Sequence, residues 1–429
     1  MTRYLLTSAI VIPFISVTLT AGQPSFKNLL ISARNDPVVS SQDNKNAAVT
    51  KTFNGIPGIE NIEFRVRNTG FDQNNFRYSL RLQPRGVLET RAAGSYNSSL
   101  ITTKRMKRNL LLNIAIYNRY ITFIDLLEWK TLLELYHELI TLYDDRIKVL
   151  EESAYSEKFE LEKLVKAEDD RSDEKVFSLE IEKNISVLEQ RVAYYLGDSS
   201  FTSFDTSGLV SIETIIRRIE TGTFSLDTNN AYLDFYRTEI DLARKRFDLE
   251  KAETRRYLDL ISFNYDNGEM YDELMRKYDL KDYNLKKSFS IELGFRIPNL
   301  TLAAHELNSR RADLLKESEK YEKVKDELSE KVRKDLADLR QLIAQYRYLK
   351  ERSSQVDVEA SLKKFVQIDG IDPLVVLEIK EDILKNRISS TSIKYGIMRN
   401  YIYVIDNAGL LSQTPIRNYL SENMEIVEW

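Results

Sequence analysis

The sequence predicts an α+β chain that is mostly helical, internally duplicated, and built from long coiled-coil helical hairpins plus four β-strands. Two long proline-free segments carry apolar residues at heptad spacing, which indicates coiled-coil helices. Two pairs of short segments alternate strictly between apolar and polar residues, which is typical of strands with two different faces. The same order of helix, strand, strand and long helical hairpin occurs twice, with an offset of roughly 200 residues, and this indicates a duplication.

Composition excludes several classes of protein. The chain has 429 residues, of which 30% are charged and 10% aromatic, so it is neither disordered nor a bundle of membrane helices. The net charge is −4, which gives no indication of nucleic acid as a partner. There is no cysteine, which excludes disulfides, thiolate metal sites, cysteine nucleophiles and a lipid anchor on an N-terminal cysteine. Glycine (14) and proline (8) are scarce, which permits very long helices.

The N-terminus resembles an export signal. Arg3 supplies a positive charge, residues 5–19 are mainly apolar, and Thr20-Ala21-Gly22 offers small residues for cleavage. The apolar run is shorter than the roughly 20 residues that a spanning helix needs. We therefore expect a signal peptide over 1–22, with a short anchor helix as the alternative, and we expect no other stretch to be apolar enough for a transmembrane helix.

The first long hairpin is predicted between Gly86 and Leu196. Residues 86–152 contain no proline, and a continuous helix of that length would extend on the order of 100 Å. Its second half carries a heptad pattern, with Leu126, Leu133, Ile140 and Ile147 at one position and Trp129, Tyr136, Tyr143 and Leu150 three residues later. A break near Glu152-Ser153-Ala154 leads into a second helix that Gly197 ends.

The second hairpin repeats this plan between Leu300 and Gly409. Residues 300–368 lack proline, residues 369–373 form the predicted turn, and a returning helix ends at Gly409. Shorter helices are expected over 26–52, interrupted at Pro37, over 211–220 and over 231–255. We expect a first repeat at 23–220, a second at 221–411, and a tail at 412–429.

A strand pair precedes each hairpin, at 62–67 with 76–83 and at 261–266 with 289–297. In a soluble sandwich, one face of such strands packs and the other is wet. In an outer-membrane barrel, the apolar face meets lipid and the polar face lines water. The aromatic residues on the apolar faces favour the barrel, and four strands close a barrel only by oligomerisation.

Arginine is concentrated on the polar faces of these strands. Five arginines outnumber Glu63 and Glu292 there, a composition that suits a water-filled lumen, although a simple solvated sheet face remains the alternative. The predicted lumen residues are Arg65, Arg67, Arg77, Arg81 and Arg296.

The order of segments resembles the TolC-like outer membrane factors. The residues that carry the resemblance are Ala33-Arg34-Asn35-Asp36-Pro37, Ile56-Pro57-Gly58-Ile59, Phe295-Arg296-Ile297-Pro298-Asn299 with the alanines and arginines that follow, and the segment 365–379. The chain departs from the family where Glu152-Ser153-Ala154 replaces the usual glycine at the first tip, at Pro373, and at Val375, where a second acidic residue is common.

The resemblance implies a homotrimer with one twelve-stranded barrel in the outer membrane and a helical tunnel through the periplasm. It implies partners as well, namely a periplasmic adaptor protein, an inner-membrane transporter or secretion ATPase, and outer membrane lipid. It also implies a periplasmic gate, for which the candidate residues are Asp369, Asp372 and Glu378. The alternative for Asp369 and Asp372 is that they shape the turn and cap the following helix.

The sequence gives no indication of an enzyme, a cofactor or a metal site. Its only histidines, His137 and His305, lie inside predicted long helices, and none of the common catalytic or nucleotide-binding motifs is present. The favoured function is the exit duct of a tripartite efflux pump or a type I secretion system. The alternatives are a periplasmic coiled-coil scaffold or envelope tether with a soluble sheet, and a duct-like protein that serves only as a tether or receptor.

Overall fold

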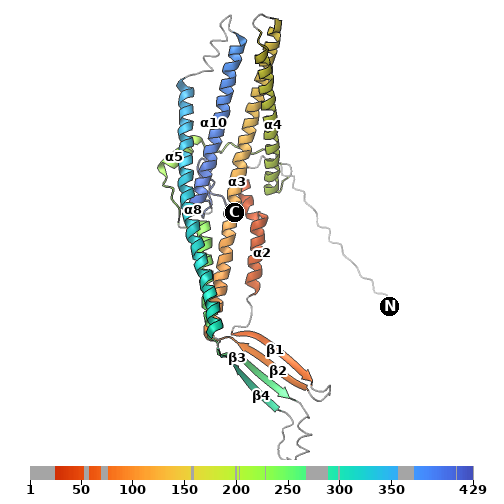
Figure 1. Ribbon diagram of the computed structural model, residues 1–429, viewed down its shortest axis with the longest axis vertical. Helices are drawn as coiled ribbons and strands as arrows, with labels where there is room; N and C mark the ends of the chain where they lie inside the picture. Colours follow the sequence, from red (N-terminus) through yellow and green to blue (C-terminus); the bar gives the residue numbers. More distant parts are fainter. Residues whose placement is uncertain are drawn as a thin grey trace, which may run out of the picture.

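The molecule is elongated, with long helices along one axis and a β-sheet at one end (Figure 1). The computed structural model describes residues 25–52, 58–68, 76–155, 159–198, 201, 203–227, 229–266, 288–297, 300–355, 372–411 and 413–428. The expected signal peptide, 1–22, lies outside the described residues. The order of one helix, two strands and two long helices occurs twice along the chain.

The first helical segment consists of α1 (Phe26–Ile31), a 3₁₀ turn at Ser32–Asn35 and α2 (Pro37–Thr52). Pro37 ends the first part because its ring cannot continue a helix from the preceding turn, but it fits the first position of the next one. The carboxylate of Asp36 then accepts a hydrogen bond from the backbone N–H of Val38 at 3.0 Å. The interruption predicted at Pro37 is therefore confirmed.

Four antiparallel strands form one sheet in the order β1-β2-β3-β4. They are β1 (Ile59–Asn68), β2 (Phe76–Pro84), β3 (Leu258–Asp266) and β4 (Ser288–Phe295). The two strand pairs are far apart in the sequence, and β2 joins them by pairing with β3. The last strand ends at Phe295, two residues before the predicted end, whereas the other three contain the predicted segments.

Four long helices form most of the described helical bundle. They are α3 (Val87–Glu152), α4 (Leu161–Leu196), α8 (Leu300–Gln355) and α10 (Pro373–Ala408). Gly197 and Gly409 end α4 and α10 with φ of 66° and 88°, in the left-handed region that favours glycine. At Gly409 a β-carbon would also lie 2.8 Å from Asn230, so a larger residue is excluded there.

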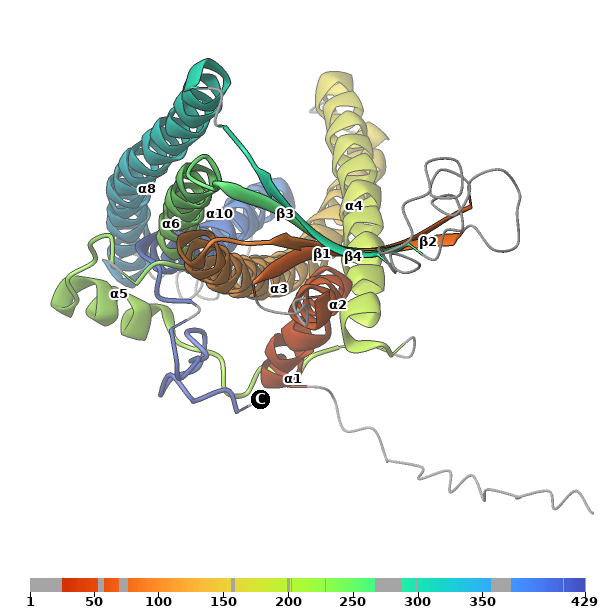
Figure 2. The same ribbon diagram turned by 90° about the horizontal axis from the view of Figure 1, so that it is seen from below.

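The helix α3 is at the centre of the bundle. Figure 2 shows α4 on one side of it and α6 (Ala231–Glu253) and α10 on the other, in agreement with its contacts. A segment of α3 is long and apolar enough to cross a membrane by length and composition, contrary to the sequence-based expectation. Half of that segment is buried inside the bundle, as in the core helix of a folded protein.

The buried surface of α3 differs from the predicted heptad stripe between residues 132 and 142. Leu133, Tyr136 and Ile140 are only half-buried there, and the fully buried residues are their neighbours Leu132, Leu135, Leu139 and Leu142. This part of α3 has two adjacent apolar stripes, and heptad spacing alone cannot decide which of them the neighbouring helices cover. The predicted stripes on α4 and α8 are buried or half-buried as expected.

The chain after α10 packs against α5 (Ile212–Thr221). The guanidinium of Arg218 donates hydrogen bonds to the carbonyl oxygens of Tyr419, Ser421 and Glu422, at 2.7 to 2.9 Å. A backbone hydrogen bond of 2.8 Å from Val210 to Leu420 adds to this contact. The C-terminal segment is therefore fixed to the connector between the two repeats.

An ionic cluster joins the sheet to the helices. Arg256, between α6 and β3, pairs with Glu60 of β1, with Asp259 of β3 at 3.3 Å and with Glu89 of α3 at 3.3 Å. The side chain of Glu89 is 3% exposed, and it also accepts a hydrogen bond from the backbone N–H of Gly86 at the start of α3. We call Arg256, Glu60, Glu89 and Asp259 the junction cluster.

Replacing Glu89 by alanine should destabilise the junction. The change leaves the mostly buried guanidinium of Arg256 with fewer partners and removes the carboxylate from the start of α3. We expect the free energy of unfolding to fall by roughly 3 kcal/mol, measured by urea unfolding followed by circular dichroism. Glu138→Ala is the matched control on the same helix, since its pair with Arg387 is half exposed and should contribute less than about 1 kcal/mol. Equal losses in the two variants would contradict the structural role of the cluster.

A buried carboxyl in α10 should make stability depend on pH. Burial raises the pKa of Asp406 from 3.8 to about 6, against the opposing hydrogen bond from Asn113 and the charge of Lys331. The folded protein binds the proton of Asp406 more tightly than the unfolded chain does. The protonated carboxyl therefore stabilises the fold at pH below 3.8, and this stabilisation is lost as the pH rises through about 6.

We therefore expect Asp406 to reduce the free energy of unfolding by up to about 3 kcal/mol between these pH values. Asp406→Asn should remove this part of the pH dependence, measured as unfolding midpoints at a series of pH values. The groups that surround Asp406 are Asn113, Tyr232, Lys331 and Asp335. An identical pH profile in the variant would show that another group is responsible.

Candidate functional site

The two faces of the sheet differ completely in chemistry. Cross-strand partners on one face are apolar in every strand, as in the row that joins Phe64, Leu80, Phe263 and Ile291. Much of this face is open, and Phe64 is 65% and Ile291 58% exposed. An apolar sheet face of this kind requires a cover, which no other element of the described chain provides.

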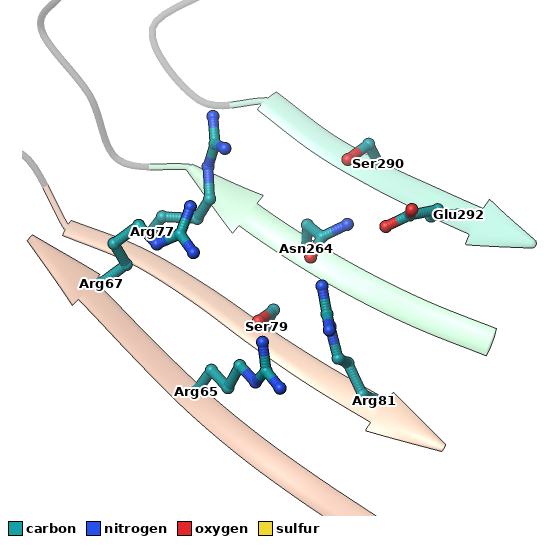
Figure 3. A pocket seen from close by; sticks show the side chains of 8 residues that line it. All are labelled: Arg65, Arg67, Arg77, Ser79, Arg81, Asn264, Ser290 and Glu292. Carbon is teal, nitrogen blue, oxygen red and sulfur yellow. The ribbon is translucent and has the colours of Figure 1, made fainter. Parts of the chain in front are cut away.

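The opposite face is polar and contains a hollow with a cavity volume of about 230 Å³ (Figure 3). We call it the arginine hollow. Its side chains all project from the same face because polar residues occupy every second position of each strand. The residues that line it are Arg65, Arg67, Arg77, Ser79, Arg81, Asn264, Ser290 and Glu292.

Positive charge dominates the arginine hollow. Four of the eight lining side chains are guanidiniums and one is a carboxylate, that of Glu292. Arg65 is paired with Glu63 on the same strand at 2.6 Å. Arg67 and Arg77 are direct partners across β1 and β2. The hollow therefore presents excess positive charge to whatever occupies it.

The structure places four of the five predicted lumen arginines in this hollow. Arg296 is different, since it follows the end of β4, is exposed, and is not one of the lining residues. Its backbone N–H donates to the carbonyl oxygen of Tyr257 at 2.7 Å. The serines and Asn264 that complete the lining lie on the predicted polar faces, but nothing in the sequence distinguished them from other polar strand residues.

Two of the three predicted gate residues, Asp372 and Glu378, lie at the opposite end of the molecule, at the start of α10. Asp369 lies outside the described residues. Asp372 caps α10, because its carboxylate accepts a hydrogen bond from the backbone N–H of Leu374 at 2.9 Å. Glu378 is exposed and pairs with Arg146 of α3 at 3.4 Å. The structure therefore shows the capping role of Asp372 and connects Glu378 to the other hairpin.

Sequence reasoning missed the strongest interaction at this end of the helices. Arg146 pairs with Glu381 of α10 at 2.8 Å, and both side chains are only 14% exposed. The same carboxylate accepts hydrogen bonds from Tyr143 and Lys385 at 2.8 Å each. We call Arg146, Tyr143, Glu378, Glu381 and Lys385 the tip cluster. Two spacings on α10 could have indicated it, since Glu378 and Glu381 are three residues apart on one helix face and Lys385 follows Glu381 by four residues.

The surroundings of Glu381 keep it ionised. Burial alone would raise its pKa, but hydrogen bonds from Lys385 and Tyr143, together with the charges of Lys385 and Arg146, bring the pKa below the ordinary value. The same carboxylate, after burial, contributes to raising the pKa of Tyr143. The tip cluster therefore holds α3 against α10 around one ionised carboxylate, that of Glu381.

Neither histidine lies in an arrangement suited to catalysis. His137 is exposed and lies 3.9 Å from Glu182, and His305 is also exposed. Within the described part of the chain, no group of three or more histidine, aspartate and glutamate side chains is positioned to hold a metal ion.

Comparison with solved structures finds close matches in fold over most of the chain. The outer membrane protein VceC of Vibrio cholerae matches with a TM-score of 0.67 and 13% identity, covering 90% of this chain and 96% of its own. The open outer membrane channel MtrE of Neisseria gonorrhoeae matches with a TM-score of 0.66 and 11% identity, covering 90% and 89%. The outer membrane channel CmeC of Campylobacter jejuni matches with a TM-score of 0.62 and 12% identity, covering 90% and 84%.

Comparisons of sequence alone give no family model and no curated protein that matches the chain. At such low identities the shared property is the fold. The chain therefore has the fold of these outer membrane channels, and the predicted resemblance to TolC-like outer membrane factors is confirmed at the level of structure.

Proposed function

We propose that this chain is a subunit of an outer-membrane duct, in which three copies close one barrel and continue it as a helical tunnel in the periplasm. The observation that carries the proposal is the four-stranded sheet with one apolar, exposed face and one polar face. Four strands leave two open edges with unpaired backbone N–H and C=O groups. Closure with other copies pairs these groups and turns the apolar face of the sheet toward lipid.

Exposed apolar residues on the helices support assembly with further copies. The outer side of α4 carries several of them, which a single chain leaves open to water. They are Val165, Val176, Leu179, Val187 and Tyr194. A second copy of the bundle is a suitable cover, because the fold already packs helices side by side along their whole length.

The division into a signal peptide at 1–22, repeats at 23–220 and 221–411, and a tail at 412–429 is part of this proposal. So are the partners, namely a periplasmic adaptor and an inner-membrane transporter or secretion ATPase. An exit duct contains no energy source of its own, and the proposed role is transport without catalysis. Efflux and type I secretion are both compatible with such a duct.

Arginine substitutions on the apolar face distinguish the proposed barrel from a scaffold with a soluble sheet. Replacing Ile291 or Leu80 by arginine should block membrane insertion, at a penalty of about 2–4 kcal/mol near the bilayer midplane. Ser290→Arg is the matched control, because Ser290 is the neighbour of Ile291 on the opposite face. The measurement is the amount of heat-sensitive trimer in detergent extracts of the outer membrane fraction. Equal losses at both positions, or release of the wild-type protein by osmotic shock, would support a soluble sheet.

We also propose that Asp369, Asp372 and Glu378 contribute to a periplasmic gate at the tips of the helices. Threefold symmetry would make each pore-facing carboxylate a ring of like charges that attracts cations. The pair between Glu378 and Arg146, at 3.4 Å, supports a link between this ring and the contact of α3 with α10.

Conductance measurements test the gate. Block by divalent or trivalent cations from the periplasmic side should weaken in Glu378→Ala and in Asp369→Ala. Asp372→Asn separates charge from capping, because asparagine caps a helix about as well as aspartate. If cation block is unchanged in all three variants and in the Asp369→Ala, Glu378→Ala double variant, the gate is formed by other residues.

A further inference from the structure

Guanidiniums outnumber carboxylates in and beside the arginine hollow, where Glu292 is in the lining, Glu63 pairs with Arg65, and Asp266 lies opposite Arg77. Like charges directly opposite each other destabilise a β-sheet, and Arg67 lies directly opposite Arg77. Glu292 is the only carboxylate among the eight lining residues. An anion placed between the guanidiniums would convert this repulsion into attraction, so the arrangement suits a negatively charged ligand.

The donors of the hollow match the oxygens of phosphate groups. A guanidinium presents parallel N–H donors that bind phosphate in a bidentate manner. The Nε of Arg81 is buried and has no hydrogen-bond partner within the described chain. Ser79, Ser290 and Asn264 add hydroxyl and amide donors around the guanidiniums. Few of these groups would serve an apolar or cationic ligand.

The arginines are distributed along the strands at several levels. Residues on one face of a strand repeat every second position, about 7 Å apart. The register places Arg67 with Arg77 at one level, Arg65 with Ser79 at the next, and Arg81 with Glu63 beyond it. A single phosphate can reach only one level, whereas a ligand with several linked phosphates can contact arginines of neighbouring levels together.

We propose that the arginine hollow is a binding site for polyvalent phosphate anions, which are chains of linked phosphates or small molecules with two or more phosphate groups. The ligand is water-borne, because the hollow lies on the face opposite the apolar face. The route of the ligand to this site rests on the proposed duct, but the site itself does not. All eight lining residues belong to one chain, so binding needs no second copy.

Titration calorimetry on the full chain purified in non-ionic detergent tests the site, with inorganic tripolyphosphate as the probe. We expect binding that is much tighter than that of inorganic phosphate and that weakens as salt is added. The double variant Arg67→Gln, Arg77→Gln should weaken it by about tenfold or more, since two charge-assisted contacts are lost. Glu292→Gln should strengthen binding, because it removes the only lining carboxylate.

Arg296→Gln is the matched control, because this arginine follows β4 but does not line the hollow. Arg67→Gln alone serves as a second variant. It removes one of two like charges that face each other, so it should fold normally, and it should bind tripolyphosphate more weakly. Circular dichroism of each variant checks the fold. Wild-type affinity in the Arg67→Gln, Arg77→Gln variant, or an equal loss in Arg296→Gln, would overturn the proposal.

Two further measurements are needed. One distinguishes a water-borne phosphate ligand from a lipid headgroup, and the other distinguishes the proposed duct from the proposed binding site. Displacement of tripolyphosphate by detergent micelles that contain cardiolipin, which has two headgroup phosphates, would overturn the assignment to a water-borne ligand. Conductance of the same preparations in planar bilayers tests the duct itself. Absence of conductance with binding retained would count against the duct, and conductance without binding would count against the site.

Discussion

The uncovered apolar face of the sheet is the constraint on which the rest of the structure depends. Phe64, Leu80, Phe263 and Ile291 form one apolar row across all four strands, and no element of the described chain packs over it. In water, such a face and its two open strand edges would promote aggregation. In lipid, the same face is stable once the edges are closed. In the proposed duct, this face meets lipid and the helices extend from the sheet into water.

The connection between sheet and helices depends on buried charge. Arg256 forms ion pairs with carboxylates from both halves of the chain, namely Glu60 and Glu89 in the first half and Asp259 in the second. Breaking such a cluster is more damaging than its net contribution suggests, because the remaining charge stays buried without a partner. At the far end of the bundle, Arg146 and Glu381 play the equivalent part between α3 and α10. The long helices are thus fixed by charge near both ends and by apolar contacts between them.

The arginine hollow and the tip cluster use charge in different ways. In the tip cluster, Glu381 accepts from Arg146, Tyr143 and Lys385, so its charge is satisfied within the chain. In the arginine hollow, Arg67 lies opposite Arg77 and the only lining carboxylate is Glu292, so the positive charge is in excess. A balanced cluster stabilises a contact between helices, whereas an unbalanced one attracts a ligand of opposite charge.

Local sequence determined the elements of this protein. Alternation of apolar and polar residues is a local property with a period of two, and it specified the strands and their two faces before any partner strand was known. Pro37, Gly197, Gly409 and Asp372 specified the ends of helices, because the backbone conformation at such positions depends on the residue itself. The polar face on which Arg65, Arg67, Arg77 and Arg81 lie followed from the same alternation, whereas their place in a barrel lumen stays a prediction.

Only the tertiary structure decided which residues meet across the molecule. Arg256 and Glu89 are separated by 167 positions, and Arg146 and Glu381 by 235, so no local pattern connects them. The sequence also could not decide which apolar stripe of α3 is buried, since Leu132 and Leu133 are equally apolar. The positions of the neighbouring helices bury Leu132 and leave Leu133 half-buried. Periodicity depends on the geometry of one element, whereas burial and ion pairing depend on several elements together.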